Sequence, residues 1–324
     1  MRQGKRDEIR QLCSWLILPL FSLAALPCGC GEEEGTGTGG PGDAWPEEYG
    51  SPPQELDAVP MPDGSSGKTD GAGVAGPQVA WDTSSHAVWK VSRQWTEVSA
   101  EPGLAWPASS GLDWEQKYSA WVASLPKIAA HNGYTTFSLT NPQGQTLPAP
   151  VLECAEVAIF LRAIFAAWHR LPFFLEAADR QGRLFLGHFG FRRADGTIYA
   201  SSPKYQTLYQ DHTTSWRAGQ PWPSDSKLVA RGLYGGGDEV PFLPVVNGQP
   251  ARAGAYFDKQ FLDKRVGHFL LVALAWFGSA HLADQANMYH LKPEAIRPGD
   301  VLLERWQRRG IGHTIPITRV IRLE

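Results

Sequence analysis

The strongest periodic pattern in the chain lies in its middle, in the stretch "PVLECAEVAIFLRAIFAAW". Apolar residues recur there at the three- and four-residue spacing of one helical face: Val157, Leu161, Ile164, Phe165 and Trp168. The pattern predicts a helix from about residue 153 to 170, which stops before Pro172. A single cysteine, Cys154, falls in the first turn of this helix.

Patterns on either side predict further helices and strands. Upstream, residues 111–126 fit a helix ended by Pro126, residues 134–139 fit a strand, and residues 141–150 fit a loop. Downstream, residues 172–178 and 183–192 fit two strands joined through "DRQG". Residues 201–255 fit a loop-rich segment, and residues 256–291 fit a long helical segment interrupted near Gly278. Residues 296–306 and 310–323 fit two closing strands. The chain therefore mixes helices with short strands.

The N-terminus has the pattern of an export signal. Basic residues at positions 2, 5, 6 and 10 precede an apolar run, Leu12–Leu26, which is short for a membrane-spanning helix. The following "PCGCG" resembles the cleavage site of bacterial lipoproteins, where a cysteine becomes the first residue and carries lipid. Cys30 follows a glycine and Cys28 a proline, so Cys30 fits that site better. An ordinary secretory signal with two incidental cysteines is the alternative for residues 1–30.

Residues 31–80 are too polar to form a core. Ten acidic residues face one basic residue, Lys68, and Gly, Pro and Ser are abundant, so the segment is expected to be a disordered tether. The chain has a net charge of −3, the first 30 residues carry +2 and the tether carries −9. The difference leaves about +4 for residues 81–324. This mild basic excess gives no sign of nucleic-acid binding.

The cysteine count draws attention to Cys154. Of the four cysteines, Cys13 lies in the signal and Cys28 and Cys30 at its cleavage site, so the domain at 81–324 keeps one thiol and has no intradomain disulfide. At the start of a helix, unpaired N–H groups and the helix dipole favour a thiolate and offer donors to an oxyanion. Glu153 and Glu156 oppose a thiolate. The plainer interpretation is a small core residue.

The C-terminal sequence suggests a base for this thiol. "PGDVLLE", a polar turn and "GHTIPI" resemble the closing motif of the NlpC-type cell-wall peptidases and their papain-like relatives. The resemblance implies an α+β fold, with the nucleophile helix packed on an antiparallel sheet and a large insertion at about 195–290. It also implies that Cys154 is the nucleophile and His313 the base, that Asp300 is structural, and that Gln116 is an upstream oxyanion donor. A solvated residue of its helix is the equal alternative for Gln116. Only Glu324 follows His313 as a carboxylate, so a third catalytic group is not identified.

A second histidine competes with His313. Cys154 on its helix, followed 34 residues later by His188 in "GHFGFR", resembles a transglutaminase-type core. The aspartate which that family places one strand later is missing, since serines occupy "TIYASSP" and Asp195 falls in a turn. The alternative for His188 is a strand histidine that faces solvent or a satisfied partner.

These observations lead to a functional hypothesis. We expect an exported, lipid-anchored thiol hydrolase that cleaves amide bonds, with cell-wall peptides as the implied substrate and the outer membrane as the implied location. No cofactor, metal or nucleic-acid partner is implied, and neither HExxH nor CxxC occurs. The alternatives are a transglutaminase-like acyl transferase that uses His188 and a tethered, non-catalytic binding or scaffold domain.

Overall fold

The computed structural model describes residues 84–129, 133–179, 181–233, 242, 251–283, 287–288, 291, 295–304 and 312–321. All of them belong to one unit of the chain, Trp45–Glu324. The export signal, the lipidation candidates Cys28 and Cys30, and the tether lie outside the described residues. The described residues form helices and small antiparallel sheets, which confirms the α+β class.

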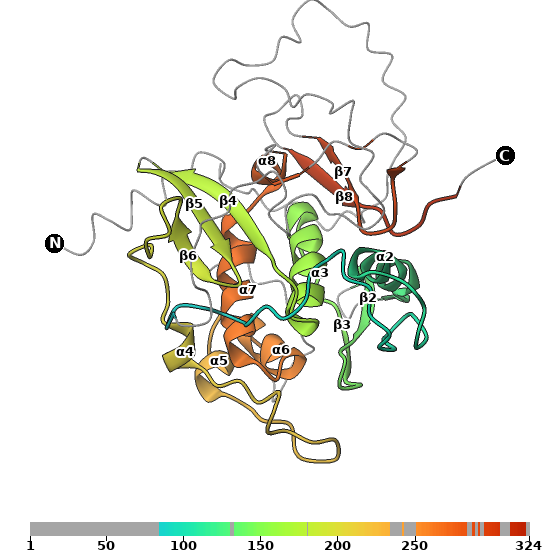
Figure 1. The fold of residues 1–324 in the computed structure, drawn as a ribbon, viewed down its shortest axis with the longest axis horizontal. Helices are drawn as coiled ribbons and strands as arrows, with labels where there is room; N and C mark the ends of the chain where they lie inside the picture. The colour runs from blue at the N-terminus through green and yellow to red at the C-terminus, as the bar shows by residue number, and fades with distance from the viewer. Residues whose placement is uncertain are drawn as a thin grey trace, which may run out of the picture. The chain divides into compact units, whose positions relative to one another are not determined.

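The predicted central helix is α3, Cys154–Trp168. Ten of its fifteen residues are buried, as expected for a helix covered on most of its surface. It packs against α7, Lys264–Trp276, and against α2, Trp114–Ser124 (Figure 1). Glu115 of α2 forms an ion pair with Arg162 of α3, and the rings of Trp121 and Phe165 lie 5.4 Å apart. The helix that begins at Cys154 is therefore part of the main core.

The described strands form three separate antiparallel sheets. In each sheet the strands lie in chain order. The first sheet contains β1 (Lys127–Ala129), β2 (Thr135–Thr140) and β3 (Thr146–Pro148), and the second contains β4 (Phe174–Asp179), β5 (Gly182–Gly187) and β6 (Gly190–Arg193). The third contains β7 (Val301–Glu304) and β8 (His313–Pro316). The second sheet lies beside α7, where the rings of Phe191 and Trp276 are 5.6 Å apart (Figure 1). The third sheet packs on α3 through β8.

Two expectations about strands need correction. The predicted strand 183–192 is two strands, because the chain turns at His188 and Phe189 between β5 and β6. Gly190 follows that turn with φ 84°, and a Cβ there would lie 2.3 Å from the His86 carbonyl oxygen, so the position requires glycine. The loop predicted at 141–150 contains β3, which pairs with β2.

The insertion predicted at about 195–290 contains part of the core. Its described residues include α4 (Tyr205–Leu208) and α5 (Ser226–Val229). The helical segment after it is divided into α6 (Ala253–Gln260), α7 and α8 (Ser279–Leu282), with the expected break at Gly278 and another at 261–263. All α7 residues from Lys264 to Leu274 are buried, so this part of the insertion packs inside the domain.

The two closing strands are present where the sequence predicts them, as the shorter β7 and β8, which pair with each other. "RPGD" is a type II turn: the Asp300 N–H donates to the Arg297 carbonyl, and Gly299 has φ 99° at the position that favours glycine. The Asp300 carboxylate accepts the Arg297 N–H at 2.8 Å, which gives it the structural role inferred from the motif. Burial raises the pKa of Asp300, and this hydrogen bond opposes the increase. The turn fixes the start of β7, and so the register of β8 beside α3.

The C-terminal end of α3 is held by an unusual residue. Leu171 N–H donates to the Ala166 carbonyl and Arg170 N–H to that of Ala167, which is the Schellman pattern, yet its left-handed position holds Arg170 (φ 57°) instead of glycine. The Arg170 guanidinium donates to Asp263 at 3.0 Å and to Asp211 at 2.9 Å.

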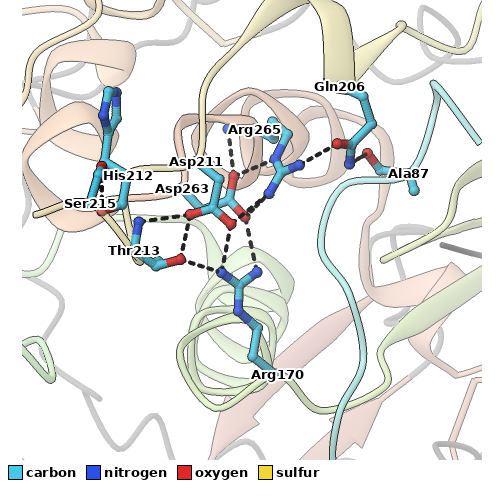
Figure 2. A network of polar contacts seen from close by, with 9 residues as sticks. All are labelled: Ala87, Arg170, Gln206, Asp211, His212, Thr213, Ser215, Asp263 and Arg265. Atoms are coloured by element: carbon cyan, nitrogen blue, oxygen red, sulfur yellow. Dashed lines mark hydrogen bonds and ion pairs between the residues drawn. The ribbon is translucent and has the colours of Figure 1, made fainter. Parts of the chain in front are cut away.

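Arg265 contacts the same two carboxylates from the start of α7 (Figure 2). Its guanidinium also donates to Gln206, and the Gln206 side chain donates to the Ala87 carbonyl. Two arginines and two aspartates therefore join the end of α3, the start of α7, the loop around Asp211 and the N-terminal segment of the domain.

Candidate functional site

Cys154 is the first residue of α3, as predicted, and its side chain is half-buried. The backbone N–H of Glu153, the residue before it, donates to the Glu156 carboxylate at 3.0 Å. One of the two flanking acidic residues therefore caps the helix. The first-turn N–H groups remain oriented along the helix axis next to the thiol.

The polar partner of the thiol is a serine from a distant part of the chain. Cys154 Sγ lies 3.4 Å from Ser279 Oγ, and Ser279 Oγ accepts a hydrogen bond of 3.0 Å from Thr314 Oγ1. The three side chains come from α3, α8 and β8. Ser279 is 8% exposed and Thr314 1% exposed, so this contact lies on the buried side of the thiol.

His313 lies on the strand next to Cys154, but its side chain is on the other face of that strand. Thr314 is buried, whereas His313 and Ile315 are exposed, because successive side chains of a strand point to opposite faces. The register places Glu304 of β7 directly opposite His313 on the same exposed face. The structure thus brings the two elements of the predicted dyad together, and places Thr314, not His313, on the side of the thiol.

His188 lies near the opposite end of α3. Its Nδ1 is 2.9 Å from the Phe173 carbonyl oxygen and its own N–H donates to that carbonyl, while its ring packs against Trp89 and Phe189. Phe173 follows the C-terminus of α3, and a helix of 15 residues is about 20 Å long. The structure therefore does not bring His188 and Cys154 together, and His188 is a buried histidine bonded to the backbone.

Gln116 caps its own helix. Its N–H donates to Asp113 Oδ1 at 2.8 Å, and its side-chain oxygen accepts the Asp113 N–H at 3.0 Å, which is a reciprocal capping box at the start of α2. The neighbouring Glu115 pairs with Arg162, two turns along α3 from Cys154. An oxyanion role for Gln116 stays a prediction, and its hydrogen bonds are those of a structural residue.

A small apolar cavity adjoins the chain that leads into Cys154. Its volume is about 70 Å³. It is lined by β2, by the segment before α3 and by the first turns of α3, namely Thr135, Thr136, Phe137, Ala149, Pro150, Val151, Leu152, Val157, Phe160 and Leu161. Cys154 is not among the lining residues, so the cavity does not open onto its thiol.

Other searches within the described parts of the chain give no further site. No cluster of three or more histidine, cysteine or acidic residues suited to a metal ion occurs there. None of the helices described combines the length and apolarity needed to cross a bilayer. His281, which the sequence places near Asp284 and His290, accepts the Gly278 N–H through Nδ1, while those two residues lie outside the described ranges.

Comparisons with protein-family models, with curated proteins and with solved structures find no match. The function is therefore argued from the residues and their geometry. Sequence reasoning missed Ser279 and Thr314, which contact the thiol or each other across 125 and 35 residues of chain. The alternation of β8 was a signal for Thr314 alone, because it places the residue after His313 on the opposite face from the histidine without showing which face packs on α3.

Proposed function

We propose that this chain is an exported, lipid-anchored thiol hydrolase that cleaves amide bonds, with Cys154 as the nucleophile and His313 as the base. One observation carries the proposal: the helix that begins at Cys154 packs on the strand that begins at His313. Adjacency of these two elements is necessary for a papain-like pairing of thiol and imidazole, which also requires the two side chains to come within hydrogen-bond reach. Cell-wall peptides as substrate, lipidation at Cys30 or Cys28, and the outer membrane remain parts of the same proposal.

The reaction would proceed through an acyl-enzyme. The Cys154 sulfur attacks the carbonyl carbon of the amide as its proton passes to His313, and first-turn N–H groups of α3 stabilise the oxyanion. The C–N bond then breaks, and His313 returns the proton to the leaving amine. Water attacks the thioester, releases the carboxylic acid and regenerates the thiol. For these steps the ring of His313, which lies on the exposed face of β8, must come within hydrogen-bond reach of the Cys154 sulfur.

The test is hydrolysis of muropeptides by the full-length protein in detergent, followed by mass spectrometry of the products. Cys154→Ala and His313→Ala should each abolish cleavage, whereas His188→Gln should keep it in the fraction of protein that remains folded. Thermal unfolding of each variant separates loss of chemistry from loss of structure. Cleavage that survives Cys154→Ala would refute the proposal.

A non-catalytic tethered domain is the second candidate, and a specific observation favours it. The thiol contacts the buried hydroxyl of Ser279, which is bonded to Thr314, while His313 lies on the exposed face of β8 opposite Glu304. On this view Cys154 is a polar part of the core. Iodoacetamide distinguishes the two candidates: if the Cys154 peptide resists alkylation in the folded protein at all pH values, the domain is non-catalytic.

A further inference from the structure

Two buried hydroxyls form a hydrogen-bonded chain that ends at the sulfur of Cys154. Ser279 begins α8, where Gly278 and His281 fix the chain: the Gly278 N–H donates to His281 Nδ1, and the His281 N–H donates to the Gly278 carbonyl. Thr314 is fixed by the ladder of β7 and β8, in register with Leu303. The contact to Cys154 is thus built from two independently anchored elements.

The direction of the hydrogen bonds follows from the number of protons. A hydroxyl carries one proton and two lone pairs. Thr314 Oγ1 donates to Ser279 Oγ, so the proton of Ser279 is free to point at Cys154 Sγ, 3.4 Å away. The chain of donation runs from Thr314 through Ser279 to the sulfur.

We propose that Ser279 is a positioning residue for the thiol, which donates a hydrogen bond to Cys154 Sγ and is itself oriented by Thr314. This inference rests on the proposed function, in which Cys154 is the nucleophile. A hydrogen bond to an ionised acceptor is stronger than one to a neutral acceptor, so Ser279 favours the thiolate over the thiol.

Packing alone does not explain the two hydroxyls. Burying a hydroxyl is unfavourable unless it is hydrogen-bonded, and alanine and valine would fill the same two positions without polar atoms. Ser279 and Thr314 are each satisfied only through this chain of contacts in the hydrogen bonds of the described residues. The arrangement therefore gains most when the sulfur is a good acceptor, as a thiolate is.

The test is the pH dependence of iodoacetamide alkylation, measured on the Cys154 peptide of the full-length protein by mass spectrometry. Ser279→Ala should move the midpoint of the profile to higher pH by about one unit, and slow alkylation at pH 7 about tenfold, because the donor to the thiolate is lost. Thr314→Val should shift it in the same direction by less, and Thr314→Ser, which keeps the hydroxyl, should not shift it. Ser215→Ala, an exposed serine bonded to the His212 carbonyl, is the matched control.

Thermal unfolding accompanies each profile, and Thr314→Val provides the result if Ser279→Ala does not fold. Profiles of Ser279→Ala and Thr314→Val that coincide with the wild type would overturn the inference. Muropeptide hydrolysis is measured on the same samples. A wild-type protein that cleaves peptides with unshifted variant profiles refutes the positioning role alone, whereas shifted profiles in a protein without hydrolysis refute the proposed function alone.

Discussion

Replacing Arg170 with glycine and with alanine separates two roles of one residue. The backbone of Arg170 has φ 57° in the Schellman turn that ends α3, a conformation that costs an L-residue roughly 1–2 kcal/mol and glycine almost nothing. Its side chain donates to Asp263, Asp211 and Thr213 (Figure 2). The substitution relieves the backbone and removes the side-chain bonds at the same time.

The side-chain term is the larger one. Removing one partner of a fully buried ion pair costs about 3–5 kcal/mol. Here the Arg170 side chain is 22% exposed and that of Asp211 26%, against 5% for Asp263, so solvent reduces the loss to about 2–3 kcal/mol. Arg265 still contacts both carboxylates. Taking about 1 kcal/mol for the relief of backbone strain, we expect Arg170→Gly to lower the free energy of unfolding by about 1–2 kcal/mol. Arg170→Ala keeps the strain and should lower it by about 2–3 kcal/mol.

Urea unfolding of the wild type and both variants measures these differences. Arg217→Ala is the control, because Arg217 is exposed and its guanidinium, among the described residues, donates only to the carbonyls of Thr214 and Trp216. Its change should be within about 0.5 kcal/mol. A glycine variant as stable as the wild type would refute the importance of the network. Equal losses for glycine and alanine would refute the backbone strain.

The same variants have an expected pH dependence. Burial opposes ionisation of Asp211, but Arg170, Thr213 and Arg265 outweigh it and hold its pKa below the ordinary value of 3.8. A carboxyl with a depressed pKa in the folded state contributes stability above its unfolded value and loses it as the pH falls. The difference between wild type and Arg170→Gly should therefore narrow below about pH 4.

Three further predictions concern other parts of the domain. Gly190→Ala should lower the free energy of unfolding in urea by at least about 3 kcal/mol, because its Cβ would lie 2.3 Å from the His86 carbonyl oxygen. Gly219→Ala, with φ 88° and open space around it, should lower it by only about 1 kcal/mol, and equal losses would contradict the contact. Gln116→Ala should lower stability by about 1 kcal/mol through the lost cap and leave the alkylation profile of Cys154 unchanged, and a changed profile would support an oxyanion role instead. Burial, with Arg93 and Lys117 nearby, lowers the pKa of His169 to about 3, so below pH 6.5 the unfolded chain binds a proton that the folded chain does not bind. His169→Phe should therefore make the free energy of unfolding fall less steeply between pH 6.5 and 3. An unchanged slope in urea titrations would show that His169 is protonated in the fold.

Local patterns in the sequence predicted the elements around the site well. The apolar spacing of α3 and the "RPGD" turn each depend on neighbouring residues, so periodicity and turn chemistry were sufficient. The turn at His188 was missed, because the apolar residues of "LFLGHFGF" continue through it. The two glycines there were the signal, since Gly187 and Gly190 both lie where another backbone leaves no room for a Cβ.

Long-range contacts were beyond the sequence. No local pattern pairs Ser279 with a thiol 125 residues earlier, or shows which face of β8 packs on α3. Buried cations were equally hidden. Lys117 is fully buried, yet its ammonium donates to the Ser99 carbonyl and lies 4.4 Å from the centre of the Trp114 ring, and both contacts depend on the folded backbone.

The pairing of α3 with α7 has a consequence for the order in which the chain can fold. α3 is apolar on most of its surface, and the helix that covers one side of it begins about 95 residues after it ends. At a synthesis rate of about 5–20 residues per second, α3 emerges from the ribosome roughly 5–20 s before α7. During that interval the apolar surface of α3 is exposed, and other chains and chaperones can bind to it. A bound chaperone would keep the protein unfolded until the whole domain has been made.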